Sequence, residues 1–326
     1  MSYDLIPGMS GAWTTNCDLL ERDHELTFLC ARVNNSTRIE GKDIHKFDYD
    51  HSRLKFKLKQ IWETLQFDFC LCLGDRESQA CAELNIPFMT RYHTLPFNIE
   101  LARKVKDHAF WTIENHDLPE LNGIRDNVIP HCINPERYTE CYEYHLKTEW
   151  SEEINVVLLA TLNHVEDPFT FIKAMRLCEK NITGYIIGSG VLSNEVKARC
   201  DNSRGRSIYL GGKNRNELPK YLKLMNVGVA CLSPQSKNNR QLKILEYCAG
   251  GIYPILSVNS KKEDSFSVLK YKDANNLVSN INFIAGKVPL SDLLKYNRNI
   301  IMEKWNALKW ANTFNEKLEV KFNARR

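Results

Sequence analysis

The sequence predicts an α/β protein made of two open, parallel-stranded domains, and three observations support this. The chain has 326 residues, which suits two domains of about 150 residues each. Short apolar runs alternate with longer amphipathic stretches from the start of the chain, as is typical of βα units around a parallel sheet. A second series of this kind opens at residue 154, after a stretch at 135–152 without a clear period that we interpret as the interdomain linker. With 43% apolar residues, the composition excludes collagen-like, low-complexity and wholly disordered chains.

The first domain is expected to span residues 1–150. A short strand at 3–6 leads through a Gly-Met-Ser-Gly turn into a helix that ends near residue 22. Apolar residues at helical spacing, beside a run of lysines, predict a helix over 52–65. Further strands are expected at 25–31, 46–49, 67–73, 87–91, 109–113 and 127–129, and a further helix at 97–106.

The second domain is expected to span residues 151–302. Its strands are predicted at 154–160, 184–187, 207–210, 227–231 and 252–256, and its helices at 169–179, 217–225 and 243–249. The tail from about 290 to 320 has the pattern of a helix, with apolar weight from Trp305, Leu308, Trp310 and Phe314.

The two halves of the chain carry opposite charge. Residues 1–150 hold 17 Lys and Arg against 24 Asp and Glu, a net charge of −7, whereas residues 151–326 hold 27 against 16, a net charge of +11. The basic half is therefore the better candidate for binding a phosphate-bearing ligand. The acidic first half argues against an interface with nucleic acid there, because such binding depends on neutralising phosphates.

The 11 cysteines predict free thiols and not a disulfide framework. Their number is odd, their spacing is irregular, and no Cys-x-x-Cys pair occurs. This usage is typical of a reducing compartment. Cys70 and Cys72 lie two residues apart on one face of a predicted strand, and we interpret them as core residues and not as metal ligands.

No apolar run approaches the roughly 20 residues that span a bilayer. The amino terminus also lacks a basic stretch followed by an apolar one, so no secretory signal is visible. We therefore expect a cytoplasmic protein without a transmembrane segment, located in a host cytoplasm if its source is viral. Peripheral contact with the cytoplasmic face of a membrane is compatible with this expectation.

Five segments of the second half follow one another in the order seen in a known family. They are Tyr-Ile-Ile-Gly-Ser-Gly at 185–190, Ile-Tyr-Leu-Gly-Gly at 208–212 with Glu-Leu-Pro-Lys-Tyr-Leu at 217–222, Val-Gly-Val-Ala-Cys-Leu-Ser-Pro at 227–234, and Lys-Ile-Leu-Glu-Tyr-Cys-Ala-Gly-Gly-Ile-Tyr-Pro-Ile at 243–255. With these segments the chain resembles the retaining GT-B glycosyltransferases, a large family of nucleotide-sugar-dependent transferases that includes sucrose synthases and lipopolysaccharide mannosyltransferases. The segments at 23–30, 88–94 and 128–134 resemble the first half of the family more weakly.

The resemblance implies the GT-B fold, in which two Rossmann-like open α/β domains face a cleft. It assigns residues 1–150 to an acceptor-side domain and residues 151–302 to a domain that binds the nucleotide-sugar donor. It also implies that the carboxyl-terminal helix, at about 303–326, crosses back to the first domain.

Nucleotide-sugar chemistry needs a cradle for a diphosphate that gains negative charge as the glycosidic bond breaks. The unpaired N–H groups at a helix amino terminus provide one. The segment at 236–243 follows a strand, carries three cations and opens the predicted helix that contains Glu246. We therefore assign Arg240 and Lys243 to the diphosphate, and Lys243 also to catalysis. The alternative is that these cations only solubilise a helix end.

The resemblance also assigns carboxylates to the donor. The family often has two Glu residues eight positions apart, the first on the sugar hydroxyls and the second on the ribose. Glu246 matches the second, but Asn238 stands at the first, which leaves the identity of the sugar open although an amide also bonds hydroxyls. The loop at 161–168 lacks the family's Arg and Lys and offers only His164 as a cation, so phosphate binding depends more on the helix cations.

Glycines and histidines complete the predicted site. Gly8 and Gly11 resemble the family's glycine loop, whose backbone approaches the donor phosphate because no Cβ intervenes. His93, at the end of a predicted strand, resembles the histidine that contacts the transferred sugar, and we assign it a catalytic role together with Asn238. His131 is a weaker candidate. The donor site further includes Gly188, Gly190 and Lys213. Plain turns at the glycines and a core or surface histidine are the alternatives.

The resemblance implies a retaining mechanism in which the departing phosphate takes the proton of the acceptor hydroxyl. Catalysis then consists of stabilising the leaving diphosphate and positioning the acceptor. No Asp-x-Asp motif stands in a suitable loop, so we expect neither a metal nor another cofactor. The co-substrate is expected to be a UDP- or GDP-sugar, and the acceptor a glycan or glycolipid.

Two other functions are compatible with the sequence. An enzyme of the same fold could add a sugar to a hydroxymethylated pyrimidine in DNA, as phage glycosyltransferases do, and the excess of Lys and Arg in the second half favours this. The acidic first half, where acceptors bind, counts against it. A non-catalytic sugar-nucleotide binding protein is the second alternative, suggested by Asn238 and the missing loop cations.

Overall fold

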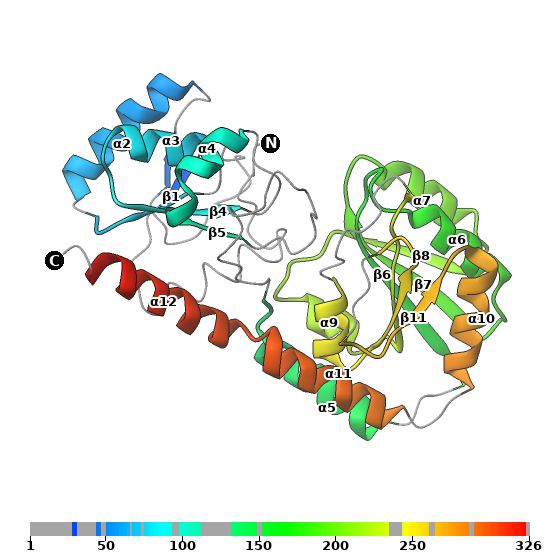
Figure 1. Cartoon of the computed structure of the whole chain (residues 1–326). Coiled ribbons are helices and arrows are strands. Elements are labelled where there is room, and N and C mark those ends of the chain that lie inside the picture. Colours follow the sequence, from blue (N-terminus) through cyan, green and yellow to red (C-terminus); the bar gives the residue numbers. More distant parts are fainter. Residues whose placement is uncertain are drawn as a thin grey trace. The chain divides into compact units, whose positions relative to one another are not determined.

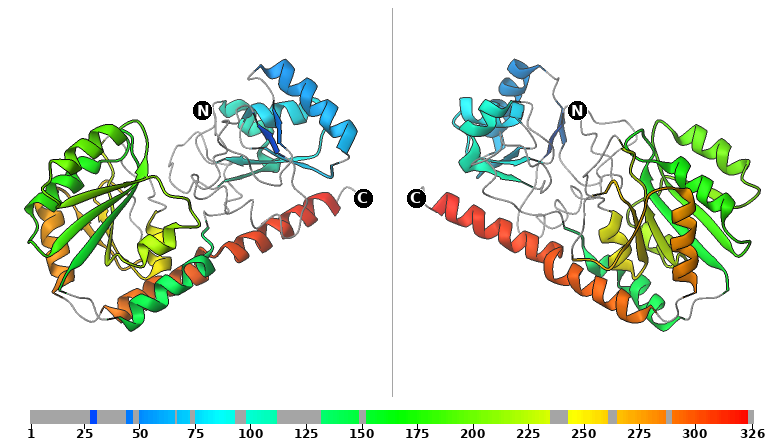
Figure 2. Two further views of the ribbon diagram at one scale, coloured as in Figure 1. Left: turned by 180° about the vertical axis from the view of Figure 1, so that it is seen from behind. Right: turned by 45° about the vertical axis from the view of Figure 1, so that its right-hand side comes forward.

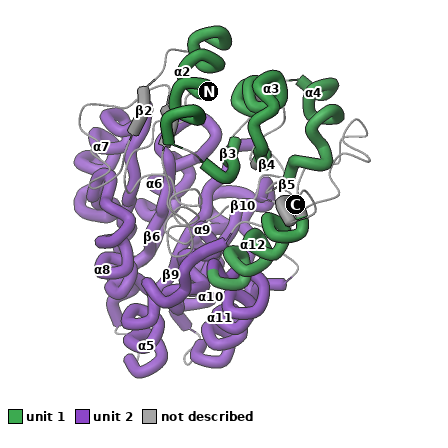
Figure 3. The backbone as a smooth tube through the Cα atoms, turned by 90° about the vertical axis from the view of Figure 1, so that its left-hand side faces the viewer, with its two compact units in different colours: residues 1–131, 308–326 green, residues 132–307 purple. Residues whose placement is uncertain are grey.

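The computed structural model of the chain (Figure 1) divides into two compact units. One is formed by residues 1–131 and 308–326, and the other by residues 132–307 (Figure 3). The structure describes residues 28–30, 44–46, 50–65, 67–72, 75–92, 98–111, 132–148, 152–234, 243–260, 265–286 and 290–323. None of the helices in these ranges combines the length and the apolar character needed to cross a membrane.

The unit of residues 132–307 contains a six-stranded parallel sheet. Its strands are β6 (Ile154–Thr161), β7 (Ile182–Ser189), β8 (Ser207–Gly211), β9 (Val227–Ala230), β10 (Tyr253–Ser257) and β11 (Leu269–Tyr271). They lie in the order β11-β10-β9-β6-β7-β8, and every neighbouring pair is parallel. This is the strand order of a doubly wound Rossmann sheet, in which the first and fourth strands along the chain are neighbours.

Helices cover both faces of this sheet (Figure 2). They are α5 (Thr139–Lys147), α6 (Pro168–Leu177), α7 (Ser193–Asp201), α8 (Leu218–Leu222), α9 (Lys243–Gly250), α10 (Ala274–Ala285) and α11 (Ser291–Lys304). In Figure 1, α6, α7 and α10 lie on one side of the sheet, and α5, α9 and α11 on the other.

Strand β6 shows why the sheet needs two helical layers. Val156 and Leu158 pack in the core with α6 and α10, whereas Val157 and Leu159 pack in the core with α5, α9 and α11. Successive side chains of a strand point to opposite faces, so an apolar run without alternation is buried on both. The predicted fold class, with Rossmann-like parallel sheets, is confirmed.

The described part of the other unit is also α/β. Its strands β3 (Cys70–Cys72), β4 (Phe88–Tyr92) and β5 (Ala109–Trp111) form a parallel sheet in that order, and β1 (Phe28–Cys30) pairs in parallel with β2 (Ile44–Lys46). Its helices are α2 (His51–Leu65), α3 (Asp75–Glu83), α4 (Ile99–Lys104), the short 3-10 helix η1 (Lys106–His108), and α12 (Ala307–Asn323), apart from its first residue. The core beneath α2 includes Leu54 and Leu58, as the helical spacing predicts.

The tail forms two helices where the sequence predicts one. Helix α11 ends at Lys304 and α12 begins at Ala307. At the break, the N–H of Ile133 donates to the carbonyl of Trp305 and the N–H of Ala307 donates to the carbonyl of Ile133, both at 2.9 Å. Ile133 therefore supplies partners for a carbonyl at the end of α11 and an N–H group at the start of α12, which have none within their own helices. Of the four apolar residues that the sequence singles out in the tail, Trp305, Trp310 and Phe314 are buried, whereas Leu308 is exposed.

The structure differs from the sequence interpretation at residues 135–152. This stretch is not an irregular linker, because most of it forms the 3-10 helix η3 (Pro135–Tyr138) and helix α5. Tyr138, Cys141 and His145 are buried at a spacing of three and four residues. Tyr138 and Cys141 pack in the same core as α9. The helical period is short and is carried by Tyr, Cys and His, so the sequence shows no clear apolar period at these residues.

Candidate functional site

The loops that follow β6 and β9 lie together at the carboxyl edge of the six-stranded sheet. The two strands are neighbours in the sheet although β7 and β8 separate them along the chain. The N–H of Ser233, after β9, donates to the carbonyl of Val165, after β6, at 2.9 Å. The strand order changes direction between β6 and β9, and ligands of open α/β sheets bind beyond such a switch point. This edge is therefore the candidate site.

Helix α9 is fixed to both strands by Tyr247, which is fully buried. Its hydroxyl accepts a hydrogen bond from the N–H of Leu159 on β6 at 2.8 Å and donates one to the carbonyl of Val229 on β9 at 2.9 Å. Gly228 leaves room for the aromatic ring, because a Cβ at this position would overlap it. These contacts determine the position of α9 and therefore that of its first residue, Lys243.

Lys243 forms an ion pair with Glu166, which lies in the loop after β6. The side chains are 11% and 13% exposed respectively, so solvent ions screen the pair little. The side-chain oxygen of Asn163 accepts hydrogen bonds from the N–H groups of Val165 and Glu166, at 2.9 Å and 3.3 Å. This turn fixes the backbone that carries Glu166. The ion pair thus joins the two loops at the switch point.

Glu246 lies three residues further along, in the same first turn of α9, and is partly buried. Burial raises the pKa of its carboxyl, and the guanidinium of Arg215 opposes this most strongly. The hydroxyl of Tyr138 and the cations of Lys243 and Arg137 oppose it further. Arg215 precedes α8 and is 6% exposed, whereas Tyr138 lies in η3 and is completely buried. The carboxylate is therefore surrounded by cationic and hydroxyl groups from three segments of the chain.

This arrangement offers the groups that a nucleoside diphosphate needs. An ionised carboxylate accepts hydrogen bonds from ribose hydroxyls. A cation at the start of a helix attracts phosphate, as do the N–H groups of that helix end. Lys243 and Glu246 combine both features within one turn of α9. The carboxylate of Glu166 pairs with the ammonium of Lys243, so a diphosphate that binds Lys243 has to compete with this carboxylate.

Gly188 and Gly190 have a packing reason to be glycine. Their φ angles are +153° and +157°. A Cβ would overlap the carbonyl oxygen of Ala160 at the first position and that of Leu162 at the second. The end of β7 therefore lies directly against the backbone of β6 and its loop. This contact explains both glycines, and their role toward the donor stays a prediction.

Lys213 lies in the loop after β8, two strands away from β6 in the sheet. Its ammonium is 4.9 Å from the centre of the Tyr221 ring, within the range of a cation–π contact. The structure thus brings Lys243 and Glu246 together and places Lys213 on another loop of the same sheet edge.

The remaining predicted site residues lie outside the part of the chain that the structure describes. Their roles stay predictions. They are Gly8, Gly11, His93, His131, Asn238 and Arg240.

Sequence reasoning missed Glu166, Arg215 and Tyr138. The resemblance directed attention to cations in the loop after β6, and Glu166 is an anion. Tyr138 lies in the segment interpreted as a linker. A usable signal existed for Glu166 and Arg215, since both are charged residues in loops that follow strands of a parallel sheet, and all such loops open at one edge.

No protein-family model matches the sequence, and no curated protein matches it either. Solved structures match its fold. HepE from Anabaena, solved with UDP and glucose, gives a TM-score of 0.74 at 12% identity, over 97% of this chain and 98% of that one. Sucrose-phosphate synthase from Thermosynechococcus elongatus gives 0.73 at 14% identity, over 95% and 92%. A glycosyltransferase from Rickettsia africae gives 0.71 at 10% identity, over 95% and 94%. The chain therefore has the fold of the GT-B glycosyltransferases, as its sequence segments predict.

Proposed function

We propose that the protein is a retaining glycosyltransferase that moves a sugar from a nucleoside-diphosphate sugar to an acceptor hydroxyl. The observation that carries the proposal is the position of Lys243 and Glu246, which share the first turn of α9 at the switch point of a Rossmann sheet. A carboxylate for ribose and a cation for diphosphate stand where such sheets bind nucleotides. The similarity in fold to glycosyltransferases supports the same conclusion.

The donor in this proposal is a UDP- or GDP-sugar. HepE has been solved in complex with UDP-glucose as well as with UDP, which favours a uridine nucleotide. Glu246 bonds the ribose, and Lys243 contacts the diphosphate together with Arg240. Asn238 bonds the hydroxyls of the sugar, and His93 contacts the sugar as it is transferred. Backbone groups at four glycines approach the donor, namely Gly8, Gly11, Gly188 and Gly190.

The proposed reaction needs no carboxylate nucleophile. The leaving diphosphate accepts the proton of the acceptor hydroxyl on the same face of the sugar, so the anomeric configuration is retained and no catalytic metal is required. Lys243 and Arg240 stabilise the charge that develops on the diphosphate, which is worth most in a site shielded from water. Placing the acceptor hydroxyl next to the anomeric carbon supplies the remaining rate enhancement.

The acceptor in this proposal is a glycan or glycolipid, and the protein acts in the cytoplasm or at the cytoplasmic face of a membrane. The net charge of +11 in residues 151–326 favours a donor that carries phosphates. The net charge of −7 in residues 1–150 is unfavourable for a DNA acceptor.

Calorimetric titration with UDP-glucose and with GDP-mannose tests the donor site. Lys243→Ala and Glu246→Ala should each weaken binding of the preferred donor by about 1–3 kcal/mol, the scale of a lost hydrogen bond to a charged group. Lys173→Ala, on the exposed side of α6, is the matched control and should leave affinity unchanged. Unchanged affinity in both site variants would contradict the assignment.

A second experiment separates a catalytic His93 from a structural one. His93→Ala should lower turnover by roughly ten- to a thousandfold, with little change in melting temperature or in affinity for the free nucleoside diphosphate, because a contact to the transferred sugar acts mainly in the transition state. A core histidine would instead lower the free energy of unfolding by about 1–3 kcal/mol and leave turnover per folded molecule intact.

A further inference from the structure

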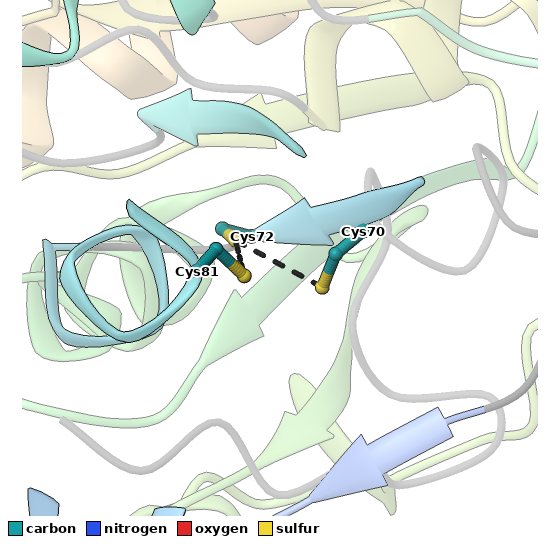
Figure 4. A group of neighbouring side chains, drawn as sticks. All are labelled: Cys70, Cys72 and Cys81. Atoms are coloured by element: carbon teal, nitrogen blue, oxygen red, sulfur yellow. Dashed lines mark hydrogen bonds between the residues drawn. The ribbon is translucent and has the colours of Figure 1, made fainter. Parts of the chain in front are cut away.

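Three cysteine thiols converge in the unit that contains the three-stranded sheet (Figure 4). Cys70 and Cys72 lie on β3, and Cys81 lies on α3. The Sγ atom of Cys72 is 3.6 Å from that of Cys81 and 4.0 Å from that of Cys70, and all three sulfurs lie within 4.8 Å of one another. Within the described ranges, no other three His, Cys, Asp or Glu side chains come as close together.

The local fold explains how the thiols meet. Residues two apart on a strand share a face, so β3 presents Cys70 and Cys72 side by side. Helix α3 packs beside β3 and brings Cys81 next to Cys72, as Figure 4 shows. Cys72 and Cys81 are 1% and 0% exposed, and Cys70 is only partly buried. The group is thus buried at Cys72 and Cys81 and partly buried at Cys70.

The sulfur triangle has the dimensions of a metal site. A metal bonded to three thiolates at about 2.3 Å holds those sulfurs roughly 3.8–4.0 Å apart. The pair of Cys70 and Cys72 already meets this spacing at 4.0 Å. The pair of Cys72 and Cys81, at 3.6 Å, has to open slightly, and Cys70 and Cys81 lie within 4.8 Å of each other. The other described cysteines form no such group. They are Cys132, Cys141, Cys178, Cys200, Cys231 and Cys248.

The sequence alone led us to interpret Cys70 and Cys72 as core residues and not as metal ligands, but the structure adds Cys81 to them. We propose that Cys70, Cys72 and Cys81 bind one thiophilic d¹⁰ metal ion, Zn²⁺ or Cu⁺, through three thiolate sulfurs. Soft sulfur ligands select these ions over Mg²⁺ or Ca²⁺. Each cysteine releases its proton to solvent and forms one sulfur–metal bond, so three protons leave as the ion enters. Three thiolates with Zn²⁺ carry a net charge of −1, and with Cu⁺ a net charge of −2. The ion fastens α3 to β3.

Each of the three thiols has to lose its proton to bind the ion. Because binding displaces protons, the affinity for the metal should rise with pH.

Metal titration of the full chain tests the proposal. The protein is reduced, stripped with a chelator under anaerobic conditions, and titrated with Zn²⁺, and separately with Cu⁺, against a chromophoric competing chelator. The expected result is one equivalent of at least one ion bound per chain. Cys70→Ser and Cys81→Ala should each weaken that binding more than tenfold, since changes in the shell around metal ligands alone cost tenfold to a hundredfold.

Two controls keep the result interpretable. Cys200→Ala removes a buried thiol from α7 and should retain full metal binding. If Cys81→Ala does not fold, the partly exposed Cys70→Ser variant still carries the test, with circular dichroism as the check on folding. The metal should also raise the melting temperature of the wild type, and not that of Cys70→Ser. Uptake far below one equivalent of both ions, or equal uptake by wild type and Cys70→Ser, would overturn the proposal.

Discussion

The ammonium of Lys243 and the carboxylate of Glu166 form an ion pair across the point where the order of strands in the six-stranded sheet reverses. Lys243 belongs to the helix after β9 and Glu166 to the loop after β6. The cation that the proposed function assigns to the diphosphate is thus already neutralised by the chain itself. In donor binding, the diphosphate then replaces the carboxylate of Glu166 as the partner of Lys243.

Replacing Glu166 by Gln should lower the stability of the protein and raise its affinity for UDP. The variant leaves Lys243 without its anion, so the free energy of unfolding should fall by about 1–3 kcal/mol in the absence of ligand. Affinity for UDP should rise, by about 1 kcal/mol or roughly fivefold, because the diphosphate no longer competes with a carboxylate. Chemical denaturation and calorimetric titration measure the two effects.

Glu195→Gln is the matched control for this experiment. Glu195 pairs with Arg199 on the surface of α7, with side chains that are about half exposed, and such pairs contribute little to stability. It should change the free energy of unfolding by less than about 1 kcal/mol and leave UDP affinity unchanged. Weaker UDP binding in Glu166→Gln would show that the pair orients Lys243 for the ligand and does not compete with it.

Two glycines with positive φ should respond differently to alanine. Gly188→Ala drives a Cβ into the carbonyl oxygen of Ala160, so overpacking adds to an unfavourable backbone conformation and the cost should reach about 3 kcal/mol or more. Gly205, at φ +79°, faces open space. Gly205→Ala should therefore cost only the conformational part, about 1–2 kcal/mol. Equal urea midpoints for the two variants would contradict the packing of β7 against β6.

Tyr247→Phe tests the attachment of α9 to the sheet. Without the hydroxyl, the N–H of Leu159 and the carbonyl of Val229 each lose a hydrogen bond in the buried core. The free energy of unfolding should fall by about 1–3 kcal/mol. Tyr296→Phe, on the exposed side of α11, is the control and should have almost no effect. A neutral Tyr247→Phe variant would mean that α9 is held by apolar packing alone.

The pKa of Glu246 predicts how stability depends on pH. Burial raises the pKa of this carboxyl in the folded protein above the ordinary value of 4.5, which applies to the unfolded chain. Between the ordinary pKa and the raised one, the folded protein therefore binds more protons than the unfolded chain. The contribution of Glu246 to the free energy of unfolding therefore falls as pH rises through this window. Glu246→Gln should remove this part of the slope when unfolding is measured between about pH 4 and pH 8. A slope unchanged by Glu246→Gln, with Glu195→Gln as control, would contradict the burial of the carboxylate.

The sequence predicted the fold well where burial has a period. Strand β6 is apolar without interruption over 156–160, and helix α2 repeats its apolar residues at helical spacing. Both elements were placed within one residue. Helix α7 was missed because its exposed polar residues, such as Glu195 and Arg199, pair with each other and leave only two buried positions. The break at Trp305 was missed because it depends on Ile133, which is far away in the sequence.

The candidate site was predictable only in part. Glu246 and Lys243 follow from the order of motifs along the chain. The ion pair between Lys243 and Glu166 and the placement of Arg215 near Glu246 depend on which strands become neighbours, and periodicity does not reveal this. The same holds for Cys81, which joins Cys70 and Cys72 only because α3 folds onto β3.

Release of nucleoside diphosphate from a sugar nucleotide tests the central claim most directly. The purified full chain is incubated with a panel of UDP- and GDP-sugars, with and without glycan and glycolipid acceptors, and free UDP or GDP is measured by chromatography. We predict release above the buffer control with at least one donor, and a drop of at least about fivefold with Glu246→Ala at donor concentrations below saturation, corresponding to a loss of about 1–3 kcal/mol. No release and no binding of any sugar nucleotide by folded wild-type protein would contradict a glycosyltransferase.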